Sequence, residues 1–143
     1  MIALDPSGRL VPRLFAADVI SQELREAARS GQVQHIVVTR ADGLVIGHNL
    51  PTPDLAKRLA AMSAAIVGTA IMASSELERG TFRVASLEAS EGRIMCMAAG
   101  PQAIVAGLAN KSADMNRVSR LLRGLANQVE EAIDQWDGGA PKT

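Results

Sequence analysis

The sequence has very few aromatic residues and one cysteine. Only Phe15, Phe82 and Trp136 are aromatic among its 143 residues, so few side chains are available to stack on nucleic-acid bases or on sugars. A lone Cys96 excludes an internal disulfide and is typical of a protein in a reducing compartment. These two shortages argue against a nucleic-acid binder and against a disulfide-stapled secreted domain.

Net charge and long hydrophobic runs are also missing. Fifteen Lys and Arg balance fifteen Asp and Glu, whereas nucleic-acid-binding proteins usually carry a basic excess. No run of about 18 apolar residues occurs, and the N-terminus lacks the basic-then-apolar pattern of a signal peptide. We therefore expect a cytoplasmic protein that neither inserts into a membrane nor binds nucleic acid.

Catalytic and metal-binding motifs are absent as well. The sequence contains no Walker loop, GxGxxG, GxSxG or HExxH pattern, so we expect no enzyme and no cofactor. His35 and His48 fall on facing strands but lack a third ligand, which favours polar sheet residues over a metal site. Cys96 lies in an apolar run without a neighbouring base, which favours a buried, inert thiol over a nucleophile.

One long, nearly uncharged helix is predicted over residues 52–80. Thr52 is placed to cap it, and Pro53 suits its first turn. Apolar residues recur at steps of three and four, which predicts a stripe facing a sheet: Leu55, Leu59, Met62, Ile66, Ala70, Ala73 and Leu77. Because residues 59–75 carry no charge, the back of this helix is also expected to be covered.

A second row on this helix is made mostly of small residues: Ala61, Ala64, Gly68 and Met72. Small residues allow a second helix to approach closely, so one interpretation is contact with another copy of the chain. The alternative is packing beneath a loop of the same chain. We favour the dimer, because burying both sides of a helix is difficult in a small monomer.

The remaining elements predict an α+β fold. A helix is expected at 16–30, strands at 32–40, 44–49, 81–89, 93–99 and 102–109, and a final helix at 113–136. The order α-β-β-α-β-β-β-α predicts a five-stranded antiparallel sheet with the long helix on one face and the terminal helices on the other. Residues 1–15 are expected to form an arm, 16–136 a single domain and 137–143 a flexible tail.

This order, with the Asp42-Gly43 hairpin before a small-residue helix, resembles the roadblock / dynein light-chain domain. The residues that carry the resemblance are 36–46, 54–75, 82–99 and 103–109. The resemblance implies a profilin-like layout and a homodimer in which an edge strand and the long helix each pair with their twin. It also implies a platform for Ras-like small GTPases, as in bacterial polarity regulators, or a scaffold subunit.

Carried onto this chain, the resemblance makes 81–89 the edge strand. The resulting candidate dimer interface comprises Ala61, Ala64, Ala65, Gly68, Met72, Phe82, Val84, Ser86 and Glu88. An ordinary edge protected by Arg83 and Glu88 remains an equal alternative for the strand. Candidate GTPase-binding residues are Arg58, Met62 and Arg79, although none is identified as an arginine finger.

Two other functions remain open. A small-molecule sensor of profilin-like layout would need a pocket lined by residues such as His35, Thr39 and His48. A purely structural dimerisation subunit would bind no GTPase. Three arginines at steps of three, Arg117, Arg120 and Arg123, suit an acidic partner or phosphates, but a solvated helix face is the usual meaning of such a run.

Overall fold

The computed structural model describes residues 24–26, 29–134, 136–137 and 140–141, together with the strand segments 3–4 and 10–11. Residues 24–26 and 29–30 are helical, and the rest of the helix expected at 16–30 lies outside the described residues. The other elements are β1 (Ala3–Leu4), β2 (Leu10–Val11), β3 (His35–Arg40), β4 (Val45–His48), α2 (Pro53–Glu76), β5 (Val84–Ala89), β6 (Gly92–Ala99), β7 (Ala103–Asn110), α3 (Met115–Asp134), β8 (Trp136–Asp137) and β9 (Ala140–Pro141).

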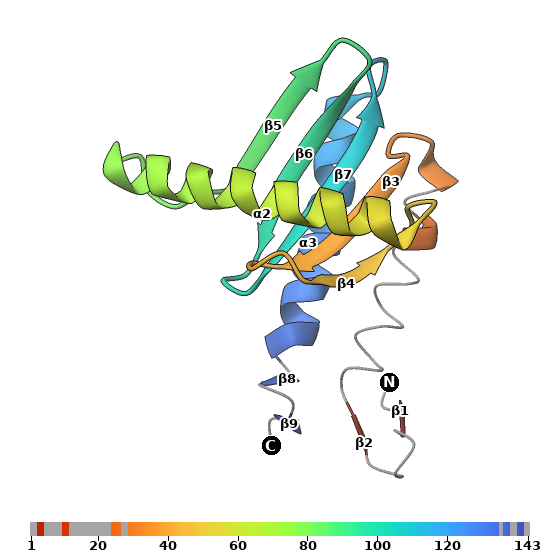
Figure 1. Ribbon diagram of the computed structural model, residues 1–143, viewed down its shortest axis with the longest axis vertical. Helices are drawn as coiled ribbons and strands as arrows, with labels where there is room; N and C mark the ends of the chain where they lie inside the picture. The colour runs from red at the N-terminus through yellow and green to blue at the C-terminus, as the bar shows by residue number, and fades with distance from the viewer. Residues whose placement is uncertain are drawn as a thin grey trace.

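Five strands form one antiparallel sheet in the order β4-β3-β7-β6-β5, which confirms the predicted α+β fold. The two β blocks join through β3 and β7, so β7 lies at the centre of the sheet and β5 at one edge. The remaining strands make two separate pairs, β1 with β2 and β8 with β9, that the sequence did not predict. In Figure 1, α2 crosses one face of the sheet and α3 lies behind the other.

The β3–β4 hairpin has the register of a two-residue Asp42-Gly43 loop but a longer turn. Val37 pairs with His48, as a two-residue Asp42-Gly43 loop would require. The chain instead turns over three residues, because Arg40 N–H donates to Leu44 O at 2.8 Å and Gly43 adopts a φ of +95°. A shift between Val38 and Thr39 then restores the register, as a β-bulge does.

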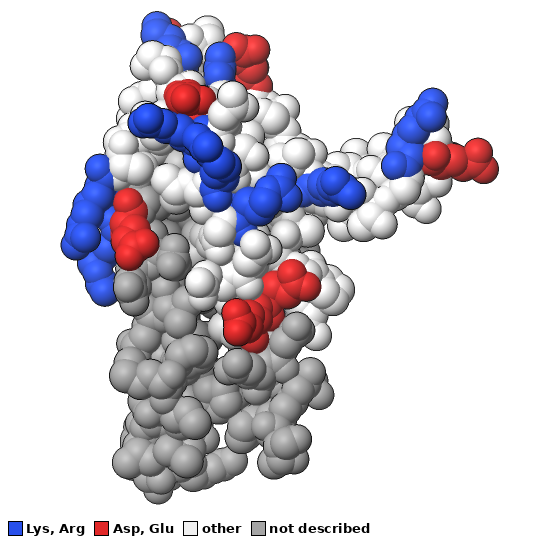
Figure 2. All heavy atoms as spheres, turned by 180° about the vertical axis from the view of Figure 1, so that it is seen from behind, with Lys and Arg blue, Asp and Glu red and all other residues white. Residues whose placement is uncertain are grey.

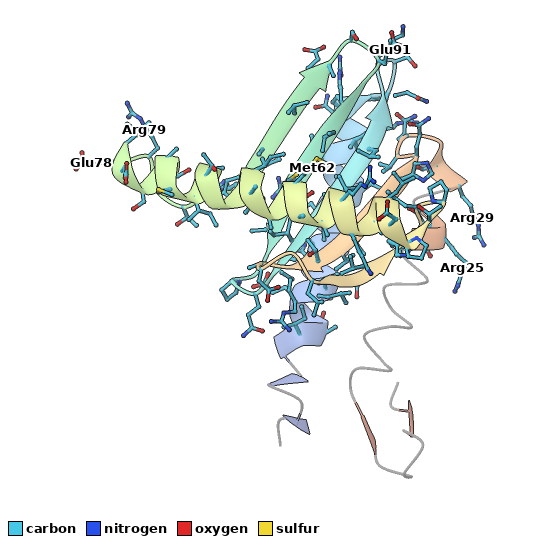
Figure 3. The ribbon with its side chains drawn as sticks, in the orientation of Figure 1. Arg25, Arg29, Met62, Glu78, Arg79 and Glu91 are labelled. Atoms are coloured by element: carbon cyan, nitrogen blue, oxygen red, sulfur yellow. The ribbon has the colours of Figure 1, made fainter. Side chains whose placement is uncertain are left out.

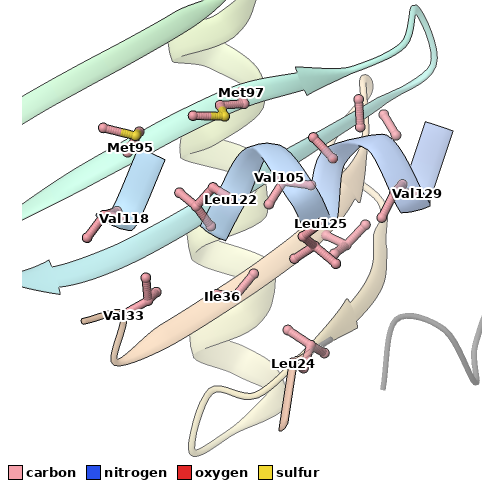
Figure 4. Close-up of a cluster of buried hydrophobic side chains, with 14 of the residues drawn as sticks. Leu24, Val33, Ile36, Met95, Met97, Val105, Val118, Leu122, Leu125 and Val129 are labelled. Carbon is pink, nitrogen blue, oxygen red and sulfur yellow. The ribbon is translucent and has the colours of Figure 1, made fainter. Parts of the chain in front are cut away.

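Two hydrophobic cores lie on the two faces of the sheet. The first core lies beneath α3, in which Val118, Leu122, Leu125 and Val129 are all fully buried. Figure 4 shows these side chains over Ile36, Met95, Met97 and Val105 of the sheet. Asp114 caps α3 by accepting from Asn116 N–H at 3.0 Å. The second core lies under α2 and includes Val37, Leu59, Val67, Cys96 and Ile104.

The stripe predicted to face the sheet from α2 is wrong for most of its members. The buried residues of the helix are Ala56, Leu59, Ala60, Ser63 and Val67, whereas Leu55, Met62 and Leu77 are exposed. The buried face is rotated from the predicted stripe by about one residue, or about 100°. Small residues dominate the true face, which allows the helix to lie close against the sheet.

Candidate interaction surface

Helix α2 is longer than the part of the sheet that it covers. Its start is fixed as predicted: Thr52 Oγ1 accepts from Leu55 N–H at 3.2 Å, and Pro53 occupies the first turn. All five buried residues of this 24-residue helix lie between Ala56 and Val67. Figure 1 shows the C-terminal part of α2 projecting past β5, beyond the edge of the sheet.

Ile71 shows what this projection leaves uncovered. It follows Val67 by four residues and therefore lies on the sheet-facing side of the helix. Val67 is 2% exposed, whereas Ile71 is 50% exposed because no sheet of this chain lies beneath it. The pattern of apolar residues in the sequence did not single out Ile71. Its spacing of four residues from Val67 identifies Ile71 only when the buried face of α2 is already known.

Exposed apolar side chains gather on α2 and β5. Nine large apolar side chains are exposed in the described part of the chain, and seven of them lie on these two elements or at the C-cap of α2. The seven are Leu55, Met62, Ile71, Met72, Leu77, Val84 and Leu87. This surface is continuous with the overhanging end of the helix, as expected for a face that meets another protein.

The row of small residues on α2 divides into two parts. A Cβ atom placed on Gly43 would lie 3.6 Å from Ala61 Cα and 3.8 Å from Ala64 Cβ, so the β3–β4 turn packs beside these two alanines. The small size of Ala61 and Ala64 is therefore explained by packing against this turn of the same chain. A Cβ atom placed on Gly68 would meet nothing within 4 Å, and Met72 is 58% exposed. Gly68 and Met72, with the exposed Ala65, form the open part of the row.

Strand β5 forms the edge of the sheet next to the overhang. It pairs with β6 on one side, with Ala85 opposite Cys96 and Leu87 opposite Ile94, and it has no strand on the other side among the described residues. Val84, Ser86 and Glu88 are exposed, whereas Phe82 precedes the strand and packs partly buried against the core under α2. Arg93 donates to Glu88 at 3.2 Å, across the strand pair.

The three candidate GTPase-binding residues do not converge within one protomer. Arg58 forms an exposed ion pair with Asp54 at 3.0 Å near the start of α2. Met62 is 55% exposed on the middle of the helix, and Figure 3 shows Arg79 beside Glu78 at its far end. Since a helix rises about 1.5 Å per residue, Arg58 and Arg79 are about 30 Å apart.

The polar residues considered for a ligand pocket or metal site have partners within the chain. Thr39 Oγ1 lies 3.0 Å from Leu44 O, His48 Nδ1 accepts from Leu50 N–H at 3.1 Å, and His35 Nδ1 lies 3.3 Å from Asn49 O. No group of metal-binding side chains occurs among the residues that the structure describes. A hollow of about 170 Å³ beneath α2 is lined by other residues: Ile66, Ala85, Ser86, Leu87, Ile94 and Cys96.

Cys96 is buried, as the sequence predicted. Its side chain is 1% exposed, and burial raises the pKa of its thiol above the usual value, while the nearby Ser63 hydroxyl opposes part of that shift. A protonated, buried thiol is a poor nucleophile. Cys96 therefore contributes to the core under α2.

Helix α2 is also long and apolar enough to cross a membrane, by length and composition alone. The helix contains no unbroken run of about 18 apolar residues, because Ser and Thr interrupt it. Thr69 and Ser74 donate their hydroxyls to carbonyls one turn earlier, at 2.9 and 2.8 Å. One face of α2 packs on the sheet over Ala56–Val67, as the core helix of a folded domain does.

Comparison with known proteins gives one family and several similar folds. The family model "Roadblock/LC7 domain" matches residues 20–109. A Roadblock/LC7 domain from Streptomyces avermitilis is 27% identical, with a TM-score of 0.60, and the match covers 76% of this chain and 96% of that one. A structure of MglB in a tetrameric arrangement is 16% identical, with a TM-score of 0.71 and coverages of 87% and 91%.

Profilin II of Acanthamoeba castellanii is 12% identical, with a TM-score of 0.51 over 78% of this chain and 94% of that one. This likeness confirms the expected profilin-like layout. No curated protein matches the sequence.

Proposed function

Because this chain belongs to the Roadblock/LC7 domain family, we propose that it is a dimeric regulatory or scaffold protein that binds a Ras-like small GTPase. Proteins of this family are generally regulatory or structural, and we propose that this one also acts by contact, in the cytoplasm, without catalysis of its own. The observation that carries the proposal is the overhang of α2, which leaves an apolar helix face and an open strand edge side by side.

In the proposed dimer, the end of α2 reaches over the sheet of a second copy. Ile71 lies on the same side of α2 as the buried Val67 but is 50% exposed. A second sheet beneath Ile71 would bury it, as the sheet of this chain buries Val67. The free edge of β5 would pair with its twin, and Gly68 would allow the two α2 helices to approach closely. The tetrameric arrangement of the similar MglB supports self-association in this fold.

The proposed GTPase site lies on the outward side of the paired α2 helices. Two antiparallel α2 helices would bring Arg58 of one protomer toward Arg79 of its partner, with Met62 one turn along the helix from Arg58. A broad apolar surface with charges at its rim suits contact with mobile switch loops, and preferential contact with one loop conformation would bias the nucleotide state. The exposed Met62 on this surface can adapt to a partner of changing shape.

The direct test is a pull-down of the tagged protein from its own cells, with GDP or a non-hydrolysable GTP analogue added and bound proteins identified by mass spectrometry. We expect a Ras-like GTPase to be enriched under one of the two nucleotides. Equal enrichment under both would support the scaffold form of the proposal. Absence of any GTPase under both would contradict it and turn attention to a structural subunit or to a bound small molecule.

A matched pair of variants locates the contact. Met62→Asp places a charge on the outward face of α2, whereas Ile46→Asp places the same charge on β4, at a side chain that is 39% exposed. We expect Met62→Asp to abolish GTPase capture and Ile46→Asp to retain it, with the oligomeric state of both variants checked by sedimentation. Equal capture by both variants would place the GTPase site elsewhere.

A further inference from the structure

The face of the molecule opposite α2 carries a band of arginines. Arg117, Arg120 and Arg123 are exposed on the outer side of α3, and Figure 2 shows Lys and Arg side chains crossing this face. Arg117 Nε lies 3.9 Å from an Asp114 carboxylate oxygen. Arg120 and Arg123 form no ion pair with any residue that the structure describes, so their charge is not neutralised within the chain.

The stability of α3 does not explain this placement. The arginines occupy the first half of the helix, and the acidic Glu130 and Glu131 lie near its end. The helix dipole favours the reverse order, with acids at the start and bases at the end. No acidic residue lies in the first turn and no basic residue in the last. Arg117 and Glu131 lie in terminal turns, where the dipole disfavours their charges, whereas Arg120 and Arg123 lie beyond the first turn, where the dipole has little effect. The dipole therefore gives no reason for this placement of the arginines.

A shallow, open groove adjoins the arginine band. It has a volume of about 440 Å³ and is lined by Ser30, Gln32, Arg117, Arg120 and Leu121. The side-chain amide oxygen of Gln32 accepts from Asp114 N–H at 2.8 Å. This bond fixes the orientation of the amide and identifies the Gln32 side-chain nitrogen as its hydrogen-bond donor. The lining thus offers guanidinium and amide donors beside an apolar floor, with no carboxylate among the lining residues. Guanidinium groups bind carboxylates through paired hydrogen bonds.

The charges around the band decide the class of partner. Glu130 and Glu131 follow it along α3, Asp114 precedes it, and Figure 2 shows Asp and Glu side chains on both sides of the basic residues. A membrane or a nucleic-acid duplex presents a broad negative surface, which these acids would repel. A narrow acidic segment of a protein would contact the band and avoid them. The arginines are three residues apart in sequence, which places neighbours about 4.5 Å apart along the axis of α3. Two or three carboxylates of an acidic segment would therefore be enough to pair with the band.

We propose that the groove and arginine band formed by Gln32, Arg117, Arg120 and Arg123 bind an acidic segment of a partner protein through its carboxylates. The band lies on the opposite side of the sheet from α2. The molecule would therefore hold this partner on one face while the other face is free for self-association and for the proposed GTPase, and binding at the band does not depend on that proposal.

The test uses a fluorescein-labelled peptide of ten glutamates and measures its anisotropy as the full-length protein is added at low salt. We expect saturable binding that weakens as salt is raised, because the arginines are exposed. Arg120→Gln combined with Arg123→Gln should weaken binding about tenfold, as expected when two exposed ion pairs are lost. Lys57→Gln combined with Lys111→Gln removes the same charge elsewhere and should leave binding unchanged.

Several results would overturn the proposal. Equal weakening by both double variants would show that the peptide senses only net charge. Tighter binding to phosphatidylserine vesicles or to a DNA duplex than to the peptide, lost with the same arginines, would assign the band to a different class of partner. Dissociation of an oligomer on removing the arginines would show that the band instead meets the acidic end of α3 in a second copy.

Discussion

Ser63 on α2 and Cys96 on β6 meet where the long helix crosses the sheet, and their side chains are 0% and 1% exposed. The Ser63 hydroxyl finds no hydrogen-bonding nitrogen or oxygen among the described residues. It lies close enough to the thiol to lower the thiol pKa, but burial raises that pKa by more. This contact holds α2 in place by close packing of small side chains. It also places a titratable group, the Cys96 thiol, in the core.

The raised pKa of Cys96 predicts a loss of stability at alkaline pH. In the unfolded chain the thiol ionises near its usual pKa of about 8.5, while in the folded protein it stays protonated to higher pH. Its contribution is therefore complete below the unfolded pKa and is lost as pH rises through the folded pKa. Between those values, the free energy of unfolding should fall by up to about 1.4 kcal/mol per pH unit. Urea unfolding from pH 7 to 10 measures this fall.

Cys96→Ala is the control, because it removes the titrating group. Its stability should change less with pH than that of the wild type over the same range. Parallel pH profiles for the two proteins would contradict the prediction.

Replacing Cys96 should also leave partner binding intact. The thiol is buried under α2 and faces away from the proposed contact surface, so Cys96→Ala or Cys96→Ser should capture the same partners in the pull-down. Far-UV circular dichroism confirms that each variant is folded. Lost capture by a folded variant would assign the thiol a role in binding.

Gly68→Leu separates the stability of the monomer from that of the dimer. A Cβ atom at Gly68 meets nothing within 4 Å, and leucine favours a helix over glycine by about 0.5–1 kcal/mol, so the isolated fold should become more stable. In a close helix–helix contact the same side chain overpacks the interface, at a cost of about 1–3 kcal/mol. We expect a dimer dissociation constant about tenfold weaker or more, measured by sedimentation.

Gly68→Ala is the matched substitution, with a smaller expected effect on the dimer. An unchanged dissociation constant for Gly68→Leu would move the interface to another surface.

Substitution by alanine should change the stability of the fold in opposite directions at Gly43 and at Gly124. Gly43 has a φ of +95°, in the region that side chains disfavour, so Gly43→Ala should destabilise the fold by about 1–2 kcal/mol. Gly124 lies exposed in α3 with open space around it, so Gly124→Ala should stabilise it by about 0.5–1 kcal/mol. Denaturant unfolding measures both changes. Destabilisation by both substitutions would show that the turn conformation is not the cause.

The sequence by itself determined the elements of this fold and the family. Regular spacing predicted the strands and both long helices, because side chains alternate in strands and recur every three or four residues in helices. In α3, charged residues on the outer face leave only one apolar side, and that side packs on the sheet. The Asp42-Gly43 hairpin was also placed correctly; its turn spans three residues and is followed by a bulge.

Only the tertiary structure decided which side of α2 meets the sheet. The middle of this helix is apolar all round, so periodicity gave no means of choosing between rows, and the larger side chains were wrongly placed inside. Ala56, Ala60 and Ser63 face the sheet because small residues allow a close approach. The overhang that exposes Ile71, and the groove that joins Gln32 to the arginines of α3, depend on where the helices lie relative to the sheet, which local patterns do not encode.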